Sequence, residues 1–133
     1  MCVWEIITSE KYDTWFLEQA EDDKALIRSK VHLLGEYGPN LGRPHADTLR
    51  GSKRLANLKE LRVKAETHEF RIAYIFDPER KGLLLTGGDK KGKRQKKFYH
   101  DLIIEAEQIY AVYLDKKEKT KETDHGISSI KRT

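Results

Sequence analysis

Three short β-prone segments in the middle of the chain constrain its fold more than any other feature of the sequence. Residues 58–65 alternate in character, with Leu61 and Val63 on one face and charged side chains on the other, as in a half-buried strand. Residues 70–76 alternate as well, and residues 83–86 are mainly apolar, which is typical of a central strand. Because only short turns separate the three segments, we expect them to form an antiparallel meander.

Helical patterns flank this meander on both sides. Residues 3–8 read as a strand, and Ser9 can cap a following helix because its hydroxyl can accept from the free amides of the first turn. A second helix is expected to begin at the carboxylates of residues 21–23 and to end at Gly38. A last helix is expected over residues 98–113, whose apolar side chains share one stripe. The predicted order is β-α-α-β-β-β-α, which defines an α+β fold.

The remaining segments set the expected domain limits. Residues 39–56 read as an unusually long loop with room for one helical turn, and such a loop is either functional or a flexible connector. Residues 87–95 read as a glycine- and lysine-rich loop. Beyond Leu114 the apolar pattern ends, so we expect one domain over residues 1–114 and a polar, disordered tail over residues 115–133.

The positive charge of the chain is concentrated in its middle. Residues 41–100 contain 16 basic and 7 acidic side chains, whereas residues 1–40 contain 4 basic and 8 acidic ones. A concentrated positive field favours a polyanionic partner such as nucleic acid, because phosphate contacts require cations. The alternative is a solvated lysine-rich surface with no partner.

Several classes of function are disfavoured by what the sequence lacks. The single cysteine, Cys2, cannot form an internal disulfide, and the five histidines show no spacing typical of metal ligands. We therefore expect no metal and no cofactor. The first residues show no signal-peptide pattern and no apolar run is long enough to cross a membrane, so we expect a cytoplasmic protein without a membrane partner.

The cations of the meander and its neighbouring loops supply the groups that metal-free RNA cleavage needs. One group must accept the proton of the ribose 2′-OH, a cation must stabilise the phosphorane, and an acid must protonate the departing 5′ oxygen. One face of the meander should pack on the helices, which leaves Arg62 and Arg71 on the other face, since an unpaired charge is not buried. The candidate catalytic residues are Lys59, Arg62, Arg71, Lys90, Lys91 and Tyr99. The candidate RNA-binding residues are Lys64, Arg80, Lys93, Arg94 and Lys97.

Each of these candidates has a structural alternative. Arg62 and Arg71 could simply pair with Glu60 and Glu69 within the sheet. The lysines of residues 90–97 could be solvated, or could bind nucleic acid without cutting it. These alternatives stay open at the level of the residues alone.

Several segments of the sequence resemble a known family in the same order. The strings NLKELRV, FRIAYIFDPERKGLLLTGGDKKG and KKFYHDLI, with WEIITSEKYDTWFLEQ and LLGEYGPNLGRPHADTL before them, are similar to the phage Gp49-like branch of the RelE/HigB toxins of bacterial type II toxin–antitoxin systems. The resemblance covers roughly residues 3–114 and leaves the tail outside.

The resemblance implies a RelE/ParE-like fold, in which an antiparallel sheet carries an N-terminal helical hairpin and a C-terminal helix. It implies an endoribonuclease that cuts mRNA, generally on the ribosome, and that a HigA-like helix-turn-helix antitoxin holds inactive. Arg62 and Arg71 match the strand arginines of such toxins, Lys90 and Lys91 match the basic residues after the last strand, and Tyr99 lies in the FY pair of the final helix. Two other functions stay possible: a non-catalytic, ParE-like inhibitor of DNA gyrase, and a nucleic-acid-binding phage accessory protein.

Overall fold

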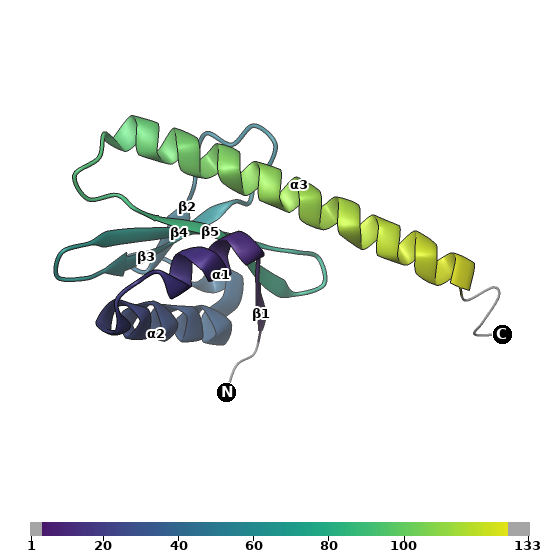
Figure 1. The fold of residues 1–133 in the computed structure, drawn as a ribbon, viewed down its shortest axis with the longest axis horizontal. Helices are drawn as coiled ribbons and strands as arrows, with labels where there is room; N and C mark the ends of the chain where they lie inside the picture. The colour runs from purple at the N-terminus through teal and green to yellow at the C-terminus, as the bar shows by residue number, and fades with distance from the viewer. Residues whose placement is uncertain (1–3, 128–133) are drawn as a thin grey trace.

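A five-stranded sheet with helices on both faces forms the body of the protein (Figure 1). The computed structural model describes residues 4–127, so residue 3 of the first predicted strand and residues 128–133 of the predicted tail lie outside the described part. The elements are β1 (Glu5–Thr8), α1 (Glu10–Leu17), α2 (Glu21–Tyr37), a 3₁₀ turn η1 (Gly38–Asn40), β2 (Ala46–Thr48), β3 (Lys59–Lys64), β4 (Glu69–Phe76), β5 (Lys81–Asp89) and α3 (Gln95–Ile127). The predicted α+β class is confirmed, and the predicted elements occur in the predicted order with one additional strand, β2, before the meander.

The strand order is β1-β5-β4-β3-β2, and β3, β4 and β5 form the predicted antiparallel meander. Two strand pairings go beyond the prediction. β1 joins the edge of the sheet parallel to β5, so the sheet is mixed rather than wholly antiparallel. β2 lies within residues 39–56, which the sequence predicts as a loop, and pairs antiparallel with β3. A three-residue strand is too short to show the alternation from which strands are predicted.

The two ends of the helical hairpin follow the predicted signals. Ser9 Oγ accepts a hydrogen bond from the Tyr12 amide at 3.0 Å and so caps α1. The second helix opens with three carboxylates in its first turn and ends at Gly38, whose φ of 60° lies in the left-handed region. A side chain at Gly38 would also collide with the indole of Trp4, since a Cβ there would lie 2.3 Å from Trp4 Nε1.

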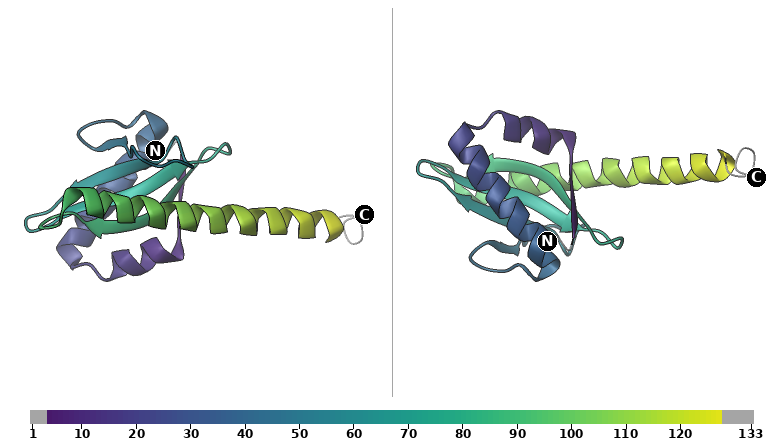
Figure 2. Two further views of the ribbon diagram at one scale, coloured as in Figure 1. Left: turned by 90° about the horizontal axis from the view of Figure 1, so that it is seen from above. Right: turned by 90° about the horizontal axis from the view of Figure 1, so that it is seen from below.

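Two apolar cores lie on the two faces of the sheet. Helices α1 and α2 cover one face, where Ile27 and Leu34 pack against Leu61 and Ile72. Helix α3 crosses the other face, where Leu102 packs in a core with strand residues such as Ile75, Leu83 and Leu85 (Figures 1 and 2). The prediction that only one face is covered by helices is therefore wrong. The stripe of the last helix needs an apolar surface, and β4 and β5 present one on that side.

Strand β5 is longer than predicted and includes Gly87 and Gly88, which the sequence places in a loop. The glycines permit close packing rather than a turn. A Cβ at Gly87 would lie 2.6 Å from the Trp15 ring of α1, and one at Gly88 would lie 3.1 Å from the Phe98 ring of α3. Glycine within a strand often marks such a close approach.

Helix α3 continues past Leu114 and projects beyond the sheet (Figure 1). Residues 115–127, which the sequence places in a polar tail expected to be disordered, continue this helix in the structure. Charged side chains support this extension in place of an apolar stripe. Asp115 pairs with Lys119 across one turn at 3.1 Å, and Lys117 pairs with Glu79 and lies 3.7 Å from Asp77 in the β4–β5 turn. Within residues 4–127, no helix is long and apolar enough to cross a bilayer.

Candidate active site and nucleic-acid interface

Four side chains from β3, β4 and α3 meet where α3 begins. Arg62 and Arg71 are direct partners in the β3–β4 register, so their side chains leave the same face of the sheet. Arg71 Nε donates to the Tyr99 hydroxyl at 3.3 Å and lies 3.6 Å from Glu60 Oε1. Glu60, Arg62, Arg71 and Tyr99 are called the arginine cluster below.

Glu60 pairs with both arginines of this cluster. Arg62 donates to Glu60 Oε2 from Nε at 3.1 Å and from Nη2 at 3.0 Å, and it also lies 3.4 Å from Asp47. Glu60 and Arg71 are only 3% and 8% exposed, and charges this deeply buried need an opposite charge nearby. The pairing with Glu60 that the sequence left open is therefore present, while no ion pair joins either arginine to Glu69 within the described residues.

The electrostatics of the cluster favour charged arginines and a neutral tyrosine. Burial lowers the pKa of Arg62, but the Glu60 carboxylate outweighs it and raises that pKa overall. Burial also raises the pKa of Tyr99, and the Glu60 carboxylate raises it further against the opposing effect of Arg71. Tyr99 therefore keeps its proton at neutral pH, as a proton donor must.

One atom of the cluster lacks a hydrogen bond. Glu60 Oε1 is buried, and within the part of the chain that the structure describes no donor reaches it with full hydrogen-bond geometry, although Arg71 Nε lies 3.6 Å away and the Tyr99 hydroxyl interacts with the same carboxylate. A buried carboxylate oxygen without a donor is costly, typically by about 1–3 kcal/mol. A substrate hydroxyl brought to this atom would supply the missing donor.

Two predicted site residues do not join the cluster. Lys59 lies on the opposite face of the sheet, where its ammonium donates to the Pro39 carbonyl at 2.9 Å. Arg80 lies in the β4–β5 turn at the far end of the meander, with its guanidinium 4.2 Å from the ring centroid of Trp4. Lys59, predicted as a catalytic residue, and Arg80, predicted as an RNA-binding residue, therefore both lie away from the strand arginines.

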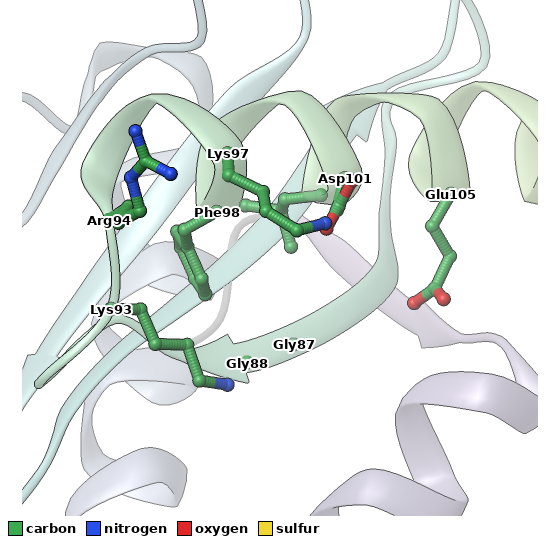
Figure 3. Close-up of a pocket in the computed structure, with 9 residues that line it drawn as sticks. Gly87, Gly88, Lys93, Arg94, Lys97, Phe98, Asp101 and Glu105 are labelled. Atoms are coloured by element: carbon green, nitrogen blue, oxygen red, sulfur yellow. The ribbon is translucent and has the colours of Figure 1, made fainter.

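The other predicted cations gather near the same end of the sheet as the cluster. Lys64 ends β3 opposite Glu69, and Lys90 and Lys91 follow β5 directly. Asp89 holds this turn in place, since its Oδ1 accepts from the amides of Glu69 and Lys91, both at 3.0 Å. A groove of about 470 Å³ between β5 and α3 is lined by Lys93, Arg94 and Lys97, of which Lys97 pairs with Asp101 at 2.8 Å (Figure 3).

The structure also places cations that the sequence analysis did not select. A second groove, of about 680 Å³, lies between the loop at residues 50–54 and the first turns of α3, with Tyr99 in its lining. Its basic residues are Arg50, Lys53, Arg54, Lys96 and His100. Three cations within five residues of the predicted loop could have indicated a basic surface. Their approach to α3 is a tertiary contact, which the local sequence does not show.

No group of three or more His, Cys, Asp or Glu side chains within residues 4–127 could hold a metal ion. The chemistry available at the cluster therefore comes from two guanidinium groups, one carboxylate and one phenol. Guanidinium groups stabilise phosphate and phosphorane oxygens through paired hydrogen bonds.

Comparison with known proteins places this arrangement in a class. The structure of a doubly substituted variant of E. coli toxin RelE in the free state matches with a TM-score of 0.50 and 13% sequence identity, over 73% of this chain and 93% of the RelE chain. The protein thus has the fold of the RelE-type toxins. The profile of the phage-derived Gp49-like proteins matches residues 14–111, and the chain belongs to that family of RelE/HigB-type toxins.

Two relatives from Mycobacterium tuberculosis support the same family. The protein named "Putative toxin HigB3" is 37% identical over 77% of this chain and 87% of its own length. The protein named "Putative toxin HigB2" is 35% identical over 84% of this chain, and the match spans 55% of that longer relative.

Proposed function

We propose that the protein is the toxin component of a type II toxin–antitoxin system and a metal-independent endoribonuclease that cleaves mRNA on the ribosome. The observation that carries this proposal is the arginine cluster: two guanidinium groups, a neutral phenol and a carboxylate with an unpartnered oxygen, all beside basic grooves. Membership of a toxin family supports it. A HigA-like helix-turn-helix antitoxin is the proposed inhibitor, and the cytoplasm, where mRNA is translated, is the proposed compartment.

The cluster can divide the steps of transesterification among its members. Arg62 and Arg71 hold the scissile phosphate and stabilise the phosphorane. The ribose 2′ oxygen attacks phosphorus, its proton passes to Glu60 Oε1, and the P–O5′ bond breaks as Tyr99 protonates the departing oxygen. The products are a 2′,3′-cyclic phosphate and a 5′-hydroxyl. Because Glu60 Oε1 is covered in the free protein, substrate binding has to uncover it.

Lys64, Lys90, Lys91, Lys93, Arg94 and Lys97 are the proposed phosphate contacts around this site. The pairing of both arginines with Glu60 is compatible with their role, since a carboxylate fixes two like charges side by side until a phosphate replaces it as their partner.

Mapping of RNA products with purified protein and translating ribosomes tests the proposal. We expect 5′-hydroxyl and 2′,3′-cyclic phosphate ends, and no cleavage where the attacking ribose is 2′-deoxy. Arg62→Lys and Arg71→Lys keep the charge but lose the planar fork, and each should lower cleavage about 100-fold. Arg28→Ala, on the surface of α2, serves as the control and should cleave normally.

Two results would reject the nuclease. Intact mRNA together with inhibited supercoiling in a DNA gyrase assay would favour a protein-binding toxin. Steeply salt-dependent RNA binding without any cleavage would favour the accessory nucleic-acid-binding protein.

A further inference from the structure

The groove between residues 50–54 and α3, called the loop groove below, carries positive charge that the protein does not neutralise. Arg50, Lys53, Arg54 and Lys96 line it and form no ion pair within the described part of the chain. Glu107 is the only carboxylate in its lining, and Ser52 Oγ donates to it at 2.6 Å. In the arginine cluster, by contrast, Glu60 pairs with both guanidinium groups.

The loop wall is held in place by specific contacts. Ser52 Oγ accepts from the Leu55 amide at 3.0 Å while donating to Glu107 of α3. The Leu49 amide donates to the Leu58 carbonyl at 2.9 Å, and both leucine side chains are buried beneath the loop. The three cations of the loop therefore stand on a supported wall, so less conformational entropy is lost when a ligand binds.

The opposite wall is apolar between its charges. Ile103 and Ile104 line the groove with Tyr99, and Ile104 is 40% exposed. A groove that combines an aromatic ring, an apolar surface and unpaired cations suits a nucleotide, whose base stacks on the apolar side while cations hold its phosphates. Its volume of about 680 Å³ falls within the usual range of ligand sites.

Tyr99 connects the loop groove to the proposed chemistry. Its ring lines the groove, and its hydroxyl accepts from Arg71 in the cluster. A nucleotide in the groove would therefore be next to the one whose phosphate the arginines hold. The bases of a duplex are stacked and paired, so only an unpaired strand can place a base against this wall.

We propose that the loop groove is a binding subsite for single-stranded RNA beside the scissile phosphate, with Arg50, Lys53, Arg54 and Lys96 on the backbone phosphates and Tyr99 and Ile103 against one base. Its position beside the scissile phosphate rests on the proposed nuclease function, whereas the binding of unpaired RNA does not. The alternative ligand of this groove is a partner protein that presents an acidic segment to the same cations.

Binding of a fluorescent, fully 2′-O-methylated RNA heptamer to the purified full chain tests this subsite, because the methyl groups prevent cleavage. For the double variant Arg50→Ala/Arg54→Ala we expect roughly tenfold weaker binding and a log K against log salt slope smaller by about 1.4, at about 0.7 per lost phosphate contact on a single strand. The double variant Arg28→Ala/Lys119→Ala removes the same charge from α2 and the distal part of α3, and it should bind as the wild type does.

Crosslinking gives the position of the strand. A heptamer that carries 4-thiouridine should crosslink within residues 50–54 or 96–104 of the wild type, and that crosslink should disappear when unlabelled heptamer competes. Arg62→Lys should keep the crosslink while losing cleavage of unmodified RNA, which separates this subsite from the catalytic cluster.

Three outcomes would overturn the subsite. The loop variant could bind the heptamer as tightly as the wild type, or the matched control could lose as much affinity, which would make the effect one of net charge. A polyglutamate peptide could bind with the same dependence on Arg50 and Arg54 while RNA does not, which would identify a protein partner. If the wild type cleaves no RNA but the heptamer binds and crosslinks as expected, the nuclease fails and the RNA groove stands.

Discussion

At the scale of single residues, Glu60 determines whether the arginine cluster can exist. Two guanidinium groups from directly paired strand positions repel each other unless a carboxylate lies between them. Glu60 takes this place and is only 3% exposed. The same residue raises the pKa of Tyr99. One carboxylate therefore contributes to stability, to the placement of the arginines and to the protonation of the tyrosine.

Substitution of Glu60 should separate its structural role from its chemical one. Glu60→Ala leaves Arg71 buried without a counter-charge and should lower the free energy of unfolding by about 3–5 kcal/mol. Glu60→Gln keeps an oxygen for Arg62 to donate to, so it should cost less stability, yet it cannot accept the 2′-OH proton and should abolish cleavage. Urea denaturation and RNA mapping measure the two effects, with exposed Glu66→Ala as the control. Full cleavage by Glu60→Gln would show that Glu60 is not the base.

Asp89 links stability to pH at the turn before α3. Its Oδ2 lies 2.5 Å from His68 Nδ1 and its Oδ1 accepts two backbone amides. Burial raises the pKa of Asp89, but hydrogen bonds from His68 and these amides outweigh it and lower the pKa overall. A carboxyl whose pKa is lower in the folded state stabilises the protein above its unfolded value, near 3.9, and loses that contribution as pH falls through the folded value.

Asp89→Asn should therefore destabilise the protein at pH 7 by about 1 kcal/mol, because Asn keeps an amide oxygen but not the charge. The difference in melting temperature between the wild type and Asp89→Asn should shrink as pH is lowered from 5 toward 3. Melting curves across this range test the sign. A difference that grows toward low pH would contradict the assigned direction of the shift.

At the scale of elements, the sequence predicts those strands and helix ends that depend on residues close together in the chain. The alternation in β3 and β4 and the helix cap at Ser9 each depend on only a few neighbouring residues, and the structure confirms them. Because the strand register follows from a short turn, Arg62 and Arg71 could be placed together in advance. The same alternation puts Lys59 with Leu61 on the face that α1 and α2 cover, away from the two arginines.

Elements that depend on distant partners could not be predicted in this way. β2 exists because β3 offers it an edge, and β1 pairs with β5 from far along the chain. The extension of α3 depends on Lys117 reaching the β4–β5 turn. The loop groove likewise requires residues 50–54 to approach α3, a contact that neither segment shows by itself. Gly87 reads as part of a loop in the sequence, but close packing against Trp15 rather than a turn requires a glycine there.

The packing of α1 on β5 makes a prediction about that glycine. In Gly87→Ala the new Cβ would meet the Trp15 ring at 2.6 Å, so the helix or the ring must shift, at a cost of about 1–3 kcal/mol. Gly42→Ala is the matched control, because a Cβ there meets nothing within 4 Å and no left-handed φ is required. Denaturation midpoints should fall for Gly87→Ala alone. Equal midpoints for both variants would show that the Trp15 ring can move aside with no loss of stability.

At the scale of the whole molecule, the two ends of the sheet differ: one holds the candidate site, and the other anchors helix α3. The arginine cluster, the turn at Asp89 and both basic grooves gather at the end where α3 begins. The other end is held by the β4–β5 turn, where Asp77 Oδ1 accepts from the amides of Glu79 and Lys81 and Lys117 of α3 approaches Oδ2. Helix α3 runs past both ends of the sheet (Figure 2).

The ion pairs at the two ends share no residue within residues 4–127, which predicts that the two ends do not couple. Lys117→Met removes the pairing with Glu79 and Asp77 and should lower the melting temperature only slightly, because exposed ion pairs contribute little, while RNA cleavage stays at the wild-type rate. Arg62→Lys should reduce cleavage about 100-fold. Because no hydrogen bond or ion pair within residues 4–127 links a residue of one site to the other, the stability changes in the double variant should add to within about 0.5 kcal/mol, and its cleavage should equal that of Arg62→Lys. Cleavage that falls in Lys117→Met would mean that α3 transmits strain along its length, and the basic end would then depend on the anchoring of the far end.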